Sequence, residues 1–332
     1  MNIVSTWFYS SSIGQDFDYP GMGPKSSDNF FQLSYFKCVI NFFASTFNQV
    51  RNSPNPNDYR LQFYYNQLPE FLSEIKFFEI MNNLNVELIQ FKPKPLPDFI
   101  SDKKLQFGSQ FYEFDVIEEV LRNNKSGDTI ALLDNDCLFI NDISRIFRDA
   151  TESNCCETVI VHGCTNPSEV IQGNTVESLH VLSDLITSGE PFRPYVHRGG
   201  EYLFMNYDLL TEFYEKIIYT YKFNNNLANS GELFFTTEEQ IFSHCYRFMP
   251  VVNDSGFLKR SWTDPKTFCN SDRSDLKFSI LHLPADKQRG LRSLFDEIYE
   301  SFNLHSTGDF LNSIGLIYSK ENLIKTFPSF SF

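Results

Sequence analysis

The stretch that most constrains the fold is an uncharged, almost wholly apolar run over residues 129–133, Thr-Ile-Ala-Leu-Leu, which is followed by Asp134, Asn135 and Asp136. A short run without polar alternation is typical of a strand that is buried on both faces. Both faces of a sheet are covered when helices alternate with strands along the chain. The run therefore predicts a central strand of an α/β protein, with two carboxylates where that strand ends.

The rest of the chain alternates in the way that an α/β protein requires. Shorter apolar or aromatic runs predict strands, and segments with apolar residues at helical spacing predict helices, one of them capped by Asp28. The expected strands cover residues 3–10, 59–65, 86–91, 129–133, 158–162, 202–206 and 278–282. The expected helices cover residues 28–47, 69–83, 111–122, 207–221, 238–246, 296–302 and 310–324.

Charge and cysteine content argue against several classes of protein. The 332 residues include 28 Lys and Arg against 42 Asp and Glu, a formal net charge of −14, which disfavours general binding of nucleic acid. The most apolar stretch, residues 35–47, is too short to cross a bilayer and is interrupted by Lys37 and Asn41, so we expect no transmembrane segment. The first residues lack the features of a signal peptide, and seven scattered cysteines indicate reduced thiols, so we expect a cytoplasmic protein.

The two carboxylates after the apolar run form the strongest candidate site. In open α/β sheets, ligands bind at the carboxyl ends of the strands. Asp134 and Asp136 are two residues apart, so both can reach one hard cation if the chain turns there, and carboxylate oxygens suit Mg²⁺ or Mn²⁺. The alternative is an ordinary Asp/Asn turn after a strand.

Three further segments carry polar residues next to predicted strands or helices. Residues 280–287 form a short strand that ends in His282, with Lys287 five residues later. Residues 198–210 begin with Gly199 and Gly200 before an apolar strand, and residues 236–242 place Glu238 and Glu239 at a helix start. Each also has a purely structural interpretation. In that interpretation His282 is an ordinary histidine at a strand end, and the two glycines only form a tight turn. Glu238 and Glu239 would then only stabilise the positive end of a helix dipole.

In their order and spacing these segments resemble the motifs of GT-A glycosyltransferases, in particular glycogenin-like and bacterial lipopolysaccharide glycosyltransferases. Residues 134–136 resemble the Asp-x-Asp motif of that fold, and residues 280–287 resemble its histidine-containing segment. The resemblance implies an α/β fold with a single Rossmann-like domain and a mixed sheet. We expect this GT-A domain to cover residues 1–292, with a C-terminal helical extension over residues 293–332 that packs on it.

The resemblance also implies a role for each candidate residue. The cation, Mn²⁺ or Mg²⁺, would be held by Asp134, Asp136 and His282. The donor would contact Trp7, Asp134, Gly199, Gly200, and Lys287 or Arg289. The family has a glycine and a nearby lysine where this chain has Gln288-Arg289-Gly290, which leaves Arg289 or Arg292 as alternatives to Lys287. A carboxylate beside the acceptor, Glu239 in preference to Glu238, would act as general base or orient a sugar.

The resemblance thus implies transfer of a hexosyl or N-acetylhexosaminyl group from a nucleoside-diphosphate sugar, with a UDP-sugar favoured. The acceptor would be a glycan, a lipid-linked molecule or a protein, as in polysaccharide biosynthesis, and the enzyme would be cytoplasmic or peripheral at a membrane. One alternative is a non-catalytic relative that binds nucleotide sugars. A phosphatase of the haloacid-dehalogenase type is a weaker alternative. Its Asp-x-Asp motif is normally on the first strand, whereas 133 residues precede Asp134 here.

Overall fold

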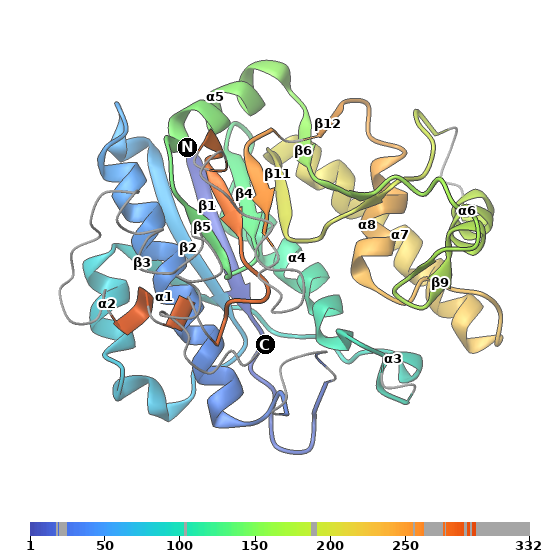
Figure 1. The fold of residues 1–332 in the computed structure, drawn as a ribbon, viewed down its shortest axis with the longest axis horizontal. Coiled ribbons are helices and arrows are strands. Elements are labelled where there is room, and N and C mark those ends of the chain that lie inside the picture. Colours follow the sequence, from blue (N-terminus) through green and yellow to red (C-terminus); the bar gives the residue numbers. More distant parts are fainter. Residues whose placement is uncertain are drawn as a thin grey trace, which may run out of the picture.

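The computed structural model describes residues 1–17, 19, 25–102, 105–186, 191–254, 256–261, 275, 277–288, 291–292 and 294–296. Seven strands form the main sheet, in the order β12-β6-β11-β4-β1-β2-β3. Their bounds are β1 Asn2–Phe8, β2 Tyr59–Tyr65, β3 Val86–Gln90, β4 Thr129–Leu133, β6 Cys156–Thr158, β11 Tyr202–Asn206 and β12 Val252–Asp254. β1 is parallel to β2 and β4, whereas β11 is antiparallel to β4 (Figure 1). The predicted α/β class and mixed sheet are confirmed.

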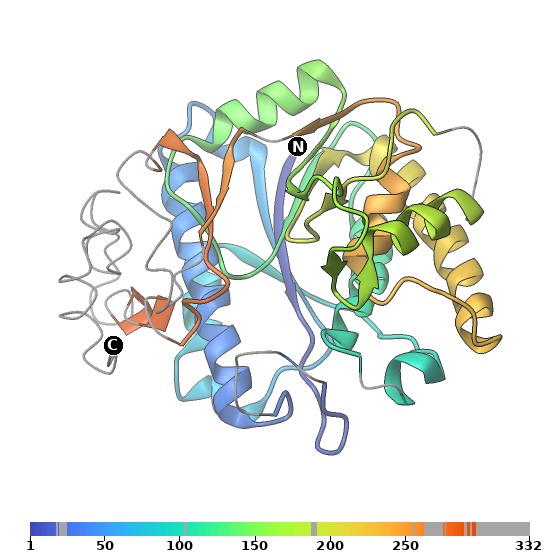
Figure 2. The same cartoon turned by 45° about the vertical axis from the view of Figure 1, so that its right-hand side comes forward.

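Helices cover both faces of this sheet. The helices are α1 Asn29–Arg51, α2 Phe77–Asn83, α3 Asp98–Asp102, α4 Glu113–Asn123, α5 Ile143–Ser153, α6 Val176–Leu185, α7 Tyr207–Asn229 and α8 Glu238–Tyr246. One hydrophobic cluster joins α1, α2 and α5 to one face, and a second joins α4, α6, α7 and α8 to the other. Figure 2 shows the sheet between α1 on one side and α7 and α8 on the other.

The central strand β4 is buried on both faces, as its sequence predicted. Ala131 and Leu133 belong to the cluster with α1, and Ile130 and Leu132 belong to the cluster with α7, because successive side chains of a strand point to opposite faces. The helix expected after Asp28 is also confirmed, since the Asp28 carboxylate accepts a hydrogen bond of 2.7 Å from the backbone N–H of Phe30.

A second, three-stranded sheet extends the fold beyond the end of β4. β5 (Cys137–Phe139) pairs antiparallel with β14 (Ile280–His282), which pairs parallel with β13 (Leu258–Arg260). Two smaller ladders join β7 (Ile160–His162) to β10 (His197–Arg198) and β8 (Val170–Ile171) to β9 (Asn174–Thr175). The three-stranded sheet is the one that positions the candidate site, because both β5 and β14 begin or end beside the Asp-x-Asp turn.

Two predicted elements are wrong in detail. The single helix expected over 69–83 is a 3₁₀ turn at Glu70–Ser73 followed by α2, because Lys76 has a positive φ of 50°. In a continuous helix, Leu72 and Phe77 would point in directions about 140° apart around the helix axis, because they are five residues apart. The break in the helix allows both side chains to reach the core. The strand expected over 158–162 is two short strands in different sheets, and Ile160 is 39% exposed rather than buried.

Part of the prediction lies where the structure gives no description. The helix expected over 310–324 and nearly all of the helix expected over 296–302 lie outside the described residues. The same holds for most of the C-terminal extension over 293–332, so the domain division stays a prediction.

Within the described parts of the chain, none of the helices combines the length and the apolar character that crossing a membrane requires.

Candidate active site

The turn between β4 and β5 directs two carboxylates into a cavity. The turn is fixed by backbone hydrogen bonds, from Asp134 N–H to the carbonyl of Glu201 at 3.1 Å and from Cys137 N–H to the carbonyl of Asp134 at 3.1 Å. The carbonyl of Asp136 accepts from the N–H of Leu283, also at 3.1 Å. The turn is therefore held by β11 and by the segment after β14, so the positions of Asp134 and Asp136 depend on the whole sheet.

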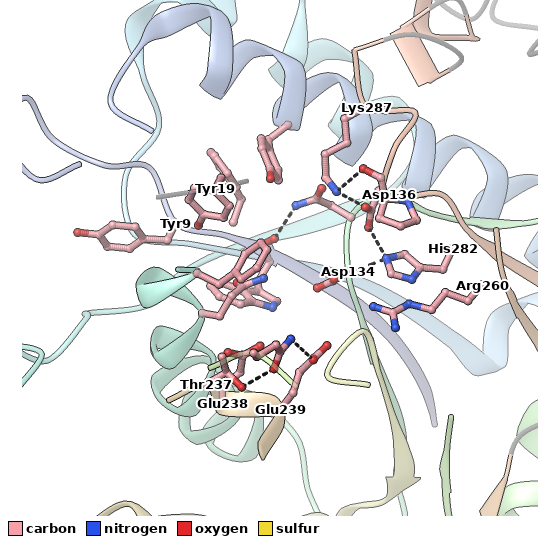
Figure 3. Close-up of a pocket in the computed structure, with 18 residues that line it drawn as sticks. Tyr9, Tyr19, Asp134, Asp136, Thr237, Glu238, Glu239, Arg260, His282 and Lys287 are labelled. Carbon is pink, nitrogen blue, oxygen red and sulfur yellow. Dashed lines mark hydrogen bonds and ion pairs between the residues drawn. The ribbon is translucent and has the colours of Figure 1, made fainter. Parts of the chain in front are cut away.

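Strand pairing brings His282 to the same turn. β14 pairs with β5 so that His282 lies opposite Cys137, the residue after Asp136. The imidazole Nε2 lies 3.2 Å from Asp136 Oδ1 and 3.8 Å from Asp134 Oδ2. The three residues that the sequence predicted as metal ligands thus converge, as Figure 3 shows.

Lys287 reaches the other oxygen of the same carboxylate. Its ammonium group donates to Asp136 Oδ2 and lies 5.4 Å from the centre of the Tyr35 ring. A basic group is therefore present beside the two aspartates. One predicted alternative, Arg289, lies outside the described residues.

Two residues that the sequence did not single out, a buried glutamate and a partly exposed arginine, lie behind the histidine. Glu201, at the start of β11, is 2% exposed, and its Oε1 lies 3.3 Å from His282 Nδ1. The same oxygen lies 3.1 Å from Nε of Arg260, which is paired with His282 in the β13–β14 ladder. A signal for Glu201 existed, namely a carboxylate directly after two glycines and before a buried strand. For Arg260 the local sequence offers no comparable signal.

Burial and the neighbouring charges set the protonation of this group. Burial and the charge of Asp136 raise the pKa of Asp134, whereas Lys287 and His282 more than offset burial and hold the pKa of Asp136 below its usual range. Burial lowers the pKa of His282, but Asp136 and Glu201 outweigh it and raise the value to about 9. Arg260 and His282 together outweigh the burial of Glu201, so its pKa falls to about 2.

The two glutamates at the start of α8 face the cavity from the other side (Figure 3). The helix is capped by Thr237, whose side chain accepts from the N–H of Gln240. Glu239 is held by three donors, Gln172 Nε2 at 2.6 Å, the N–H of Gly200 at 3.2 Å and His197 Nε2 at 3.3 Å. These contacts fix Glu239 in one position.

The neighbouring Glu238 has a different environment. Among the residues that the structure describes, its Oε2 is fully buried and has no hydrogen-bond partner. Burial, and then the charge of Glu239, raise the pKa of Glu238 well above its usual range. The pKa of Glu239 is lowered, because the hydrogen bond from His197 and the charges of His197 and Arg260 outweigh burial and the charge of Glu201. Their surroundings therefore push the pKa values of the two carboxyl groups apart, a division that is typical of acid and base partners.

The predicted glycines lie beneath these carboxylates. A Cβ atom at Gly199 would stand 1.8 Å from Glu201 Oε2, and one at Gly200 would stand 3.2 Å from Glu239 Cγ. The close approach that glycine permits is thus to the side chains of the protein itself, and both glycines leave room for carboxylates that face the candidate site.

Most of these groups surround one cavity of about 270 Å³, but Glu201 and the predicted Gly199 and Gly200 are not among its lining residues. The predicted residues that line it are Trp7, Asp134, Asp136, Glu238, Glu239, His282 and Lys287. The lining residues that the prediction did not include are Phe8, Tyr9, Tyr19, Tyr35, Phe107, Gln110, Asn135, Gln172, Thr237, Arg260 and Pro284. One wall is aromatic, with Tyr35 stacked on Phe8 at 4.9 Å between ring centres. The cavity thus joins an aromatic surface to a cluster of charged groups.

The donor atoms suit a divalent cation. Asp136 Oδ1 and His282 Nε2 are both fully buried, and within the described part of the chain neither makes a hydrogen bond of good geometry. They are 3.2 Å apart, close to the separation of about 3 Å expected for two neighbouring ligands of an octahedral cation such as Mg²⁺. Asp136, Cys137 and His282 form a buried group whose ligand atoms all lie within 4.8 Å of one another.

Several solved structures are similar to the chain, whereas no family is identified for it. No family model matches the chain, and no curated protein matches it. The galactosyltransferase LgtC, solved with donor and acceptor sugar analogues, is 12% identical over 91% of this chain and 96% of that chain, with a TM-score of 0.49. Mouse xyloside xylosyltransferase 1 is 8% identical over 85% of this chain and 97% of that chain, with a TM-score of 0.45.

A third structure, core-mannan synthase A from Aspergillus fumigatus in its Mn/GDP form, is 10% identical over 75% of this chain and 70% of that chain, with a TM-score of 0.43. These proteins are glycosyltransferases, the class whose motifs the sequence resembles. At such identities and TM-scores the likeness concerns the fold alone. The activity of this chain therefore has to be argued from the geometry of its own site.

Proposed function

We propose that this chain is a metal-dependent glycosyltransferase that moves a sugar from a nucleoside diphosphate to a hydroxyl group. One observation carries the proposal. Asp136 and His282, which come from two different sheet segments, present buried ligand atoms that face each other as an ion pair 3.2 Å apart without a hydrogen bond of good geometry among the described residues, with Lys287 beside them and an open cavity in front. Such a site can hold a divalent cation together with a diphosphate, because the cation and the lysine both offset the phosphate charge.

The donor would lie along the cavity from the aromatic wall to the charged cluster. Mn²⁺ or Mg²⁺ would be held by Asp136 and His282, with Asp134 directly or through water, and would neutralise charge on the diphosphate. Trp7 and Tyr9 line the aromatic end and would contact the nucleobase. Uracil is favoured because the sequence resemblance implies a UDP-sugar. Lys287 would turn from Asp136 to the diphosphate when the donor binds, so its ammonium group would stabilise the leaving group.

The acceptor would approach from the side of Glu238 and Glu239. In the transfer, the acceptor oxygen forms a bond to the anomeric carbon and the bond from that carbon to the diphosphate oxygen breaks. The electron pair of the broken bond stays on the diphosphate, and the hydroxyl proton passes to Glu239. The lowered pKa of Glu239 keeps it ionised and able to accept. Glu238, whose pKa is raised, would donate a hydrogen bond to a sugar hydroxyl.

The acceptor class rests on the sequence resemblance alone. Bacterial lipopolysaccharide glycosyltransferases are among the enzymes whose motifs the chain resembles, so we propose a glycan or lipid-linked acceptor. A cytoplasmic or peripheral membrane location and the choice between hexosyl and N-acetylhexosaminyl donors stay predictions.

A screen of nucleotide sugars with and without Mn²⁺ tests the proposal. Thermal unfolding and release of nucleoside diphosphate would be measured for the native chain, for Asp136→Asn, and for Asp58→Asn, a control at an exposed aspartate. We expect one donor to raise the unfolding temperature only when Mn²⁺ is present. The effect and the turnover should be lost in Asp136→Asn and kept in Asp58→Asn.

Two results would contradict parts of the proposal. Turnover that is unchanged in Asp136→Asn would refute the cation site. Metal-dependent binding of a donor without any turnover, across a panel of glycan acceptors, would instead favour the non-catalytic nucleotide-sugar-binding protein.

A further inference from the structure

The buried carboxylate of Glu201 stands directly behind the histidine of the proposed cation site. Its Oε1 is 3.3 Å from His282 Nδ1, while His282 Nε2, on the opposite side of the ring, is 3.2 Å from Asp136 Oδ1. A histidine that binds a metal through one ring nitrogen commonly donates the other N–H to a carboxylate, which fixes the tautomer and the orientation of the ring. Here the two groups face each other as a buried ion pair, with Nδ1 and Oε1 3.3 Å apart, although among the described residues the contact lacks the geometry of a good hydrogen bond.

We infer that Glu201 is a positioning residue that holds the His282 ring so that Nε2 points into the cation site. The inference rests on the proposed function, because it concerns the cation that Asp136 and His282 would bind. It goes beyond that function, since Glu201 reaches the cation only through His282 and is not itself a ligand. The residue was not among those predicted from sequence.

The surroundings of Glu201 keep the carboxylate in place. Arg260 Nε lies 3.1 Å from the same oxygen that faces His282, so a buried carboxylate has a cationic partner on each side. Gly199 lies against the other oxygen, where a Cβ would stand only 1.8 Å away. The carboxylate therefore occupies space that any residue other than glycine at position 199 would claim.

This arrangement provides two independent ways to disturb the contact. Glu201→Gln removes the charge and keeps the shape. Gly199→Ala keeps the charge but forces the carboxylate to move, because the new methyl group and Oε2 cannot share the space. If the position of the carboxylate matters, both variants must weaken cation binding, whereas a purely long-range charge effect would appear in Glu201→Gln alone.

The chain also offers a matched control for each variant. Glu157→Gln makes the same change at another buried carboxylate, on β6, which is two strands from β4 and accepts hydrogen bonds from Cys155 and Asn253. Gly163→Ala adds a methyl group at a glycine where a Cβ meets only Thr165 Cγ2, at an ordinary contact distance of 3.9 Å.

The experiment is a titration of Mn²⁺ alone, followed by the electron paramagnetic resonance signal of free Mn²⁺, on the full chain and the four variants. Urea unfolding without metal identifies variants that are folded. We expect Glu201→Gln and Gly199→Ala to bind Mn²⁺ about 10- to 100-fold more weakly, the usual effect of removing such a partner, and both controls to keep the native affinity.

Each other outcome refutes a specific step. Native affinity in both folded test variants overturns the inference and leaves the cation site standing. Weakening in Glu201→Gln with native affinity in Gly199→Ala also overturns it, because charge and not placement would then act. If Glu201→Gln does not fold, Gly199→Ala decides alone. A native chain that binds no Mn²⁺ refutes the cation site of the proposed function, and the inference fails with it.

Discussion

Replacing Glu238 by glutamine should stabilise the protein, and the gain should grow with pH. Glu238 is only 5% exposed, and its Oε2 atom has no hydrogen-bond partner among the described residues. The pKa of its carboxyl group is raised well above the ordinary value of 4.5. Burial is the main cause, followed by the charge of the adjacent Glu239. Ionising this carboxyl group in the folded protein is therefore unfavourable.

The sign and the slope follow from proton linkage. Above pH 4.5 the unfolded chain releases the Glu238 proton while the folded protein retains it. The contribution of Glu238 to the free energy of unfolding therefore falls as the pH rises. One proton corresponds to a slope of about 1.4 kcal/mol per pH unit, which continues until the pH reaches the pKa of the folded state. A glutamine side chain has nearly the same shape as glutamate and does not ionise, so this loss is absent from the variant.

Urea unfolding of the native chain and Glu238→Gln, measured without metal at several pH values from 4.5 upward, gives the difference directly. We expect the native chain and the variant to have equal free energies of unfolding near pH 4.5. At higher pH the free energy of unfolding of the variant should exceed that of the native chain by an increasing amount. The control is Glu232→Gln at an exposed carboxyl group, where a change of less than about 0.5 kcal/mol at any pH is expected. A difference that does not change with pH, or a variant that is less stable throughout, would refute the assignment of a neutral buried Glu238.

The remaining predictions concern the reaction, the cation and the core. Glu239→Gln should lower kcat by about 10²- to 10⁴-fold with Mn²⁺ affinity unchanged, because a general base is lost; a kcat close to native would argue against that role. Lys287→Met should tighten binding of Mn²⁺ alone by about tenfold and weaken binding of the donor, because the ammonium competes with the cation for Asp136 and the two positive charges repel each other. A parallel loss of both affinities, in the same Mn²⁺ titration and a donor titration, would contradict this. Phe36→Ala should lower the free energy of unfolding, measured with urea, by about 3–5 kcal/mol. The reason is that the buried ring packs against four other rings, those of Phe8, Phe63, Phe71 and Phe77. A decrease of less than about 1 kcal/mol would show that the cluster repacks.

Local signals in the sequence were sufficient for the elements that form the centre of the fold. The bounds of β2, β11 and α8 agree with the prediction, because apolar or aromatic strands and a capped helix start depend on nearby residues. The helix over 69–83 failed for the opposite reason. Its apolar spacing is compatible with a helix, and only the demand of the core for both Leu72 and Phe77 selects the break at Lys76.

The candidate site shows the same division. Asp134, Asp136 and His282 could be named in advance because the two aspartates follow a recognisable strand, His282 ends another, and both segments resemble motifs of a known family; the structure brings the three residues together. Glu201 had a local signal, but the contacts of Glu201 with His282 and Arg260 could not be assigned, since they depend on the register of β13 with β14, of β14 with β5 and of β11 with β4. Register is a tertiary property, and a shift by one residue would turn each side chain to the other face.

The balance of charge at the site explains why cation and donor should bind together. The cavity carries basic groups, Lys287, Arg260 and His282, beside the aspartates and Glu201, in a chain whose net charge is −14. A diphosphate alone would meet the aspartates, and a divalent cation alone would have to displace Lys287 from Asp136. Each partner thus removes the repulsion that opposes the other, because the cation covers the carboxylates and the diphosphate accepts the lysine. Stabilisation by Mn²⁺ and donor together should therefore exceed the sum of their separate effects.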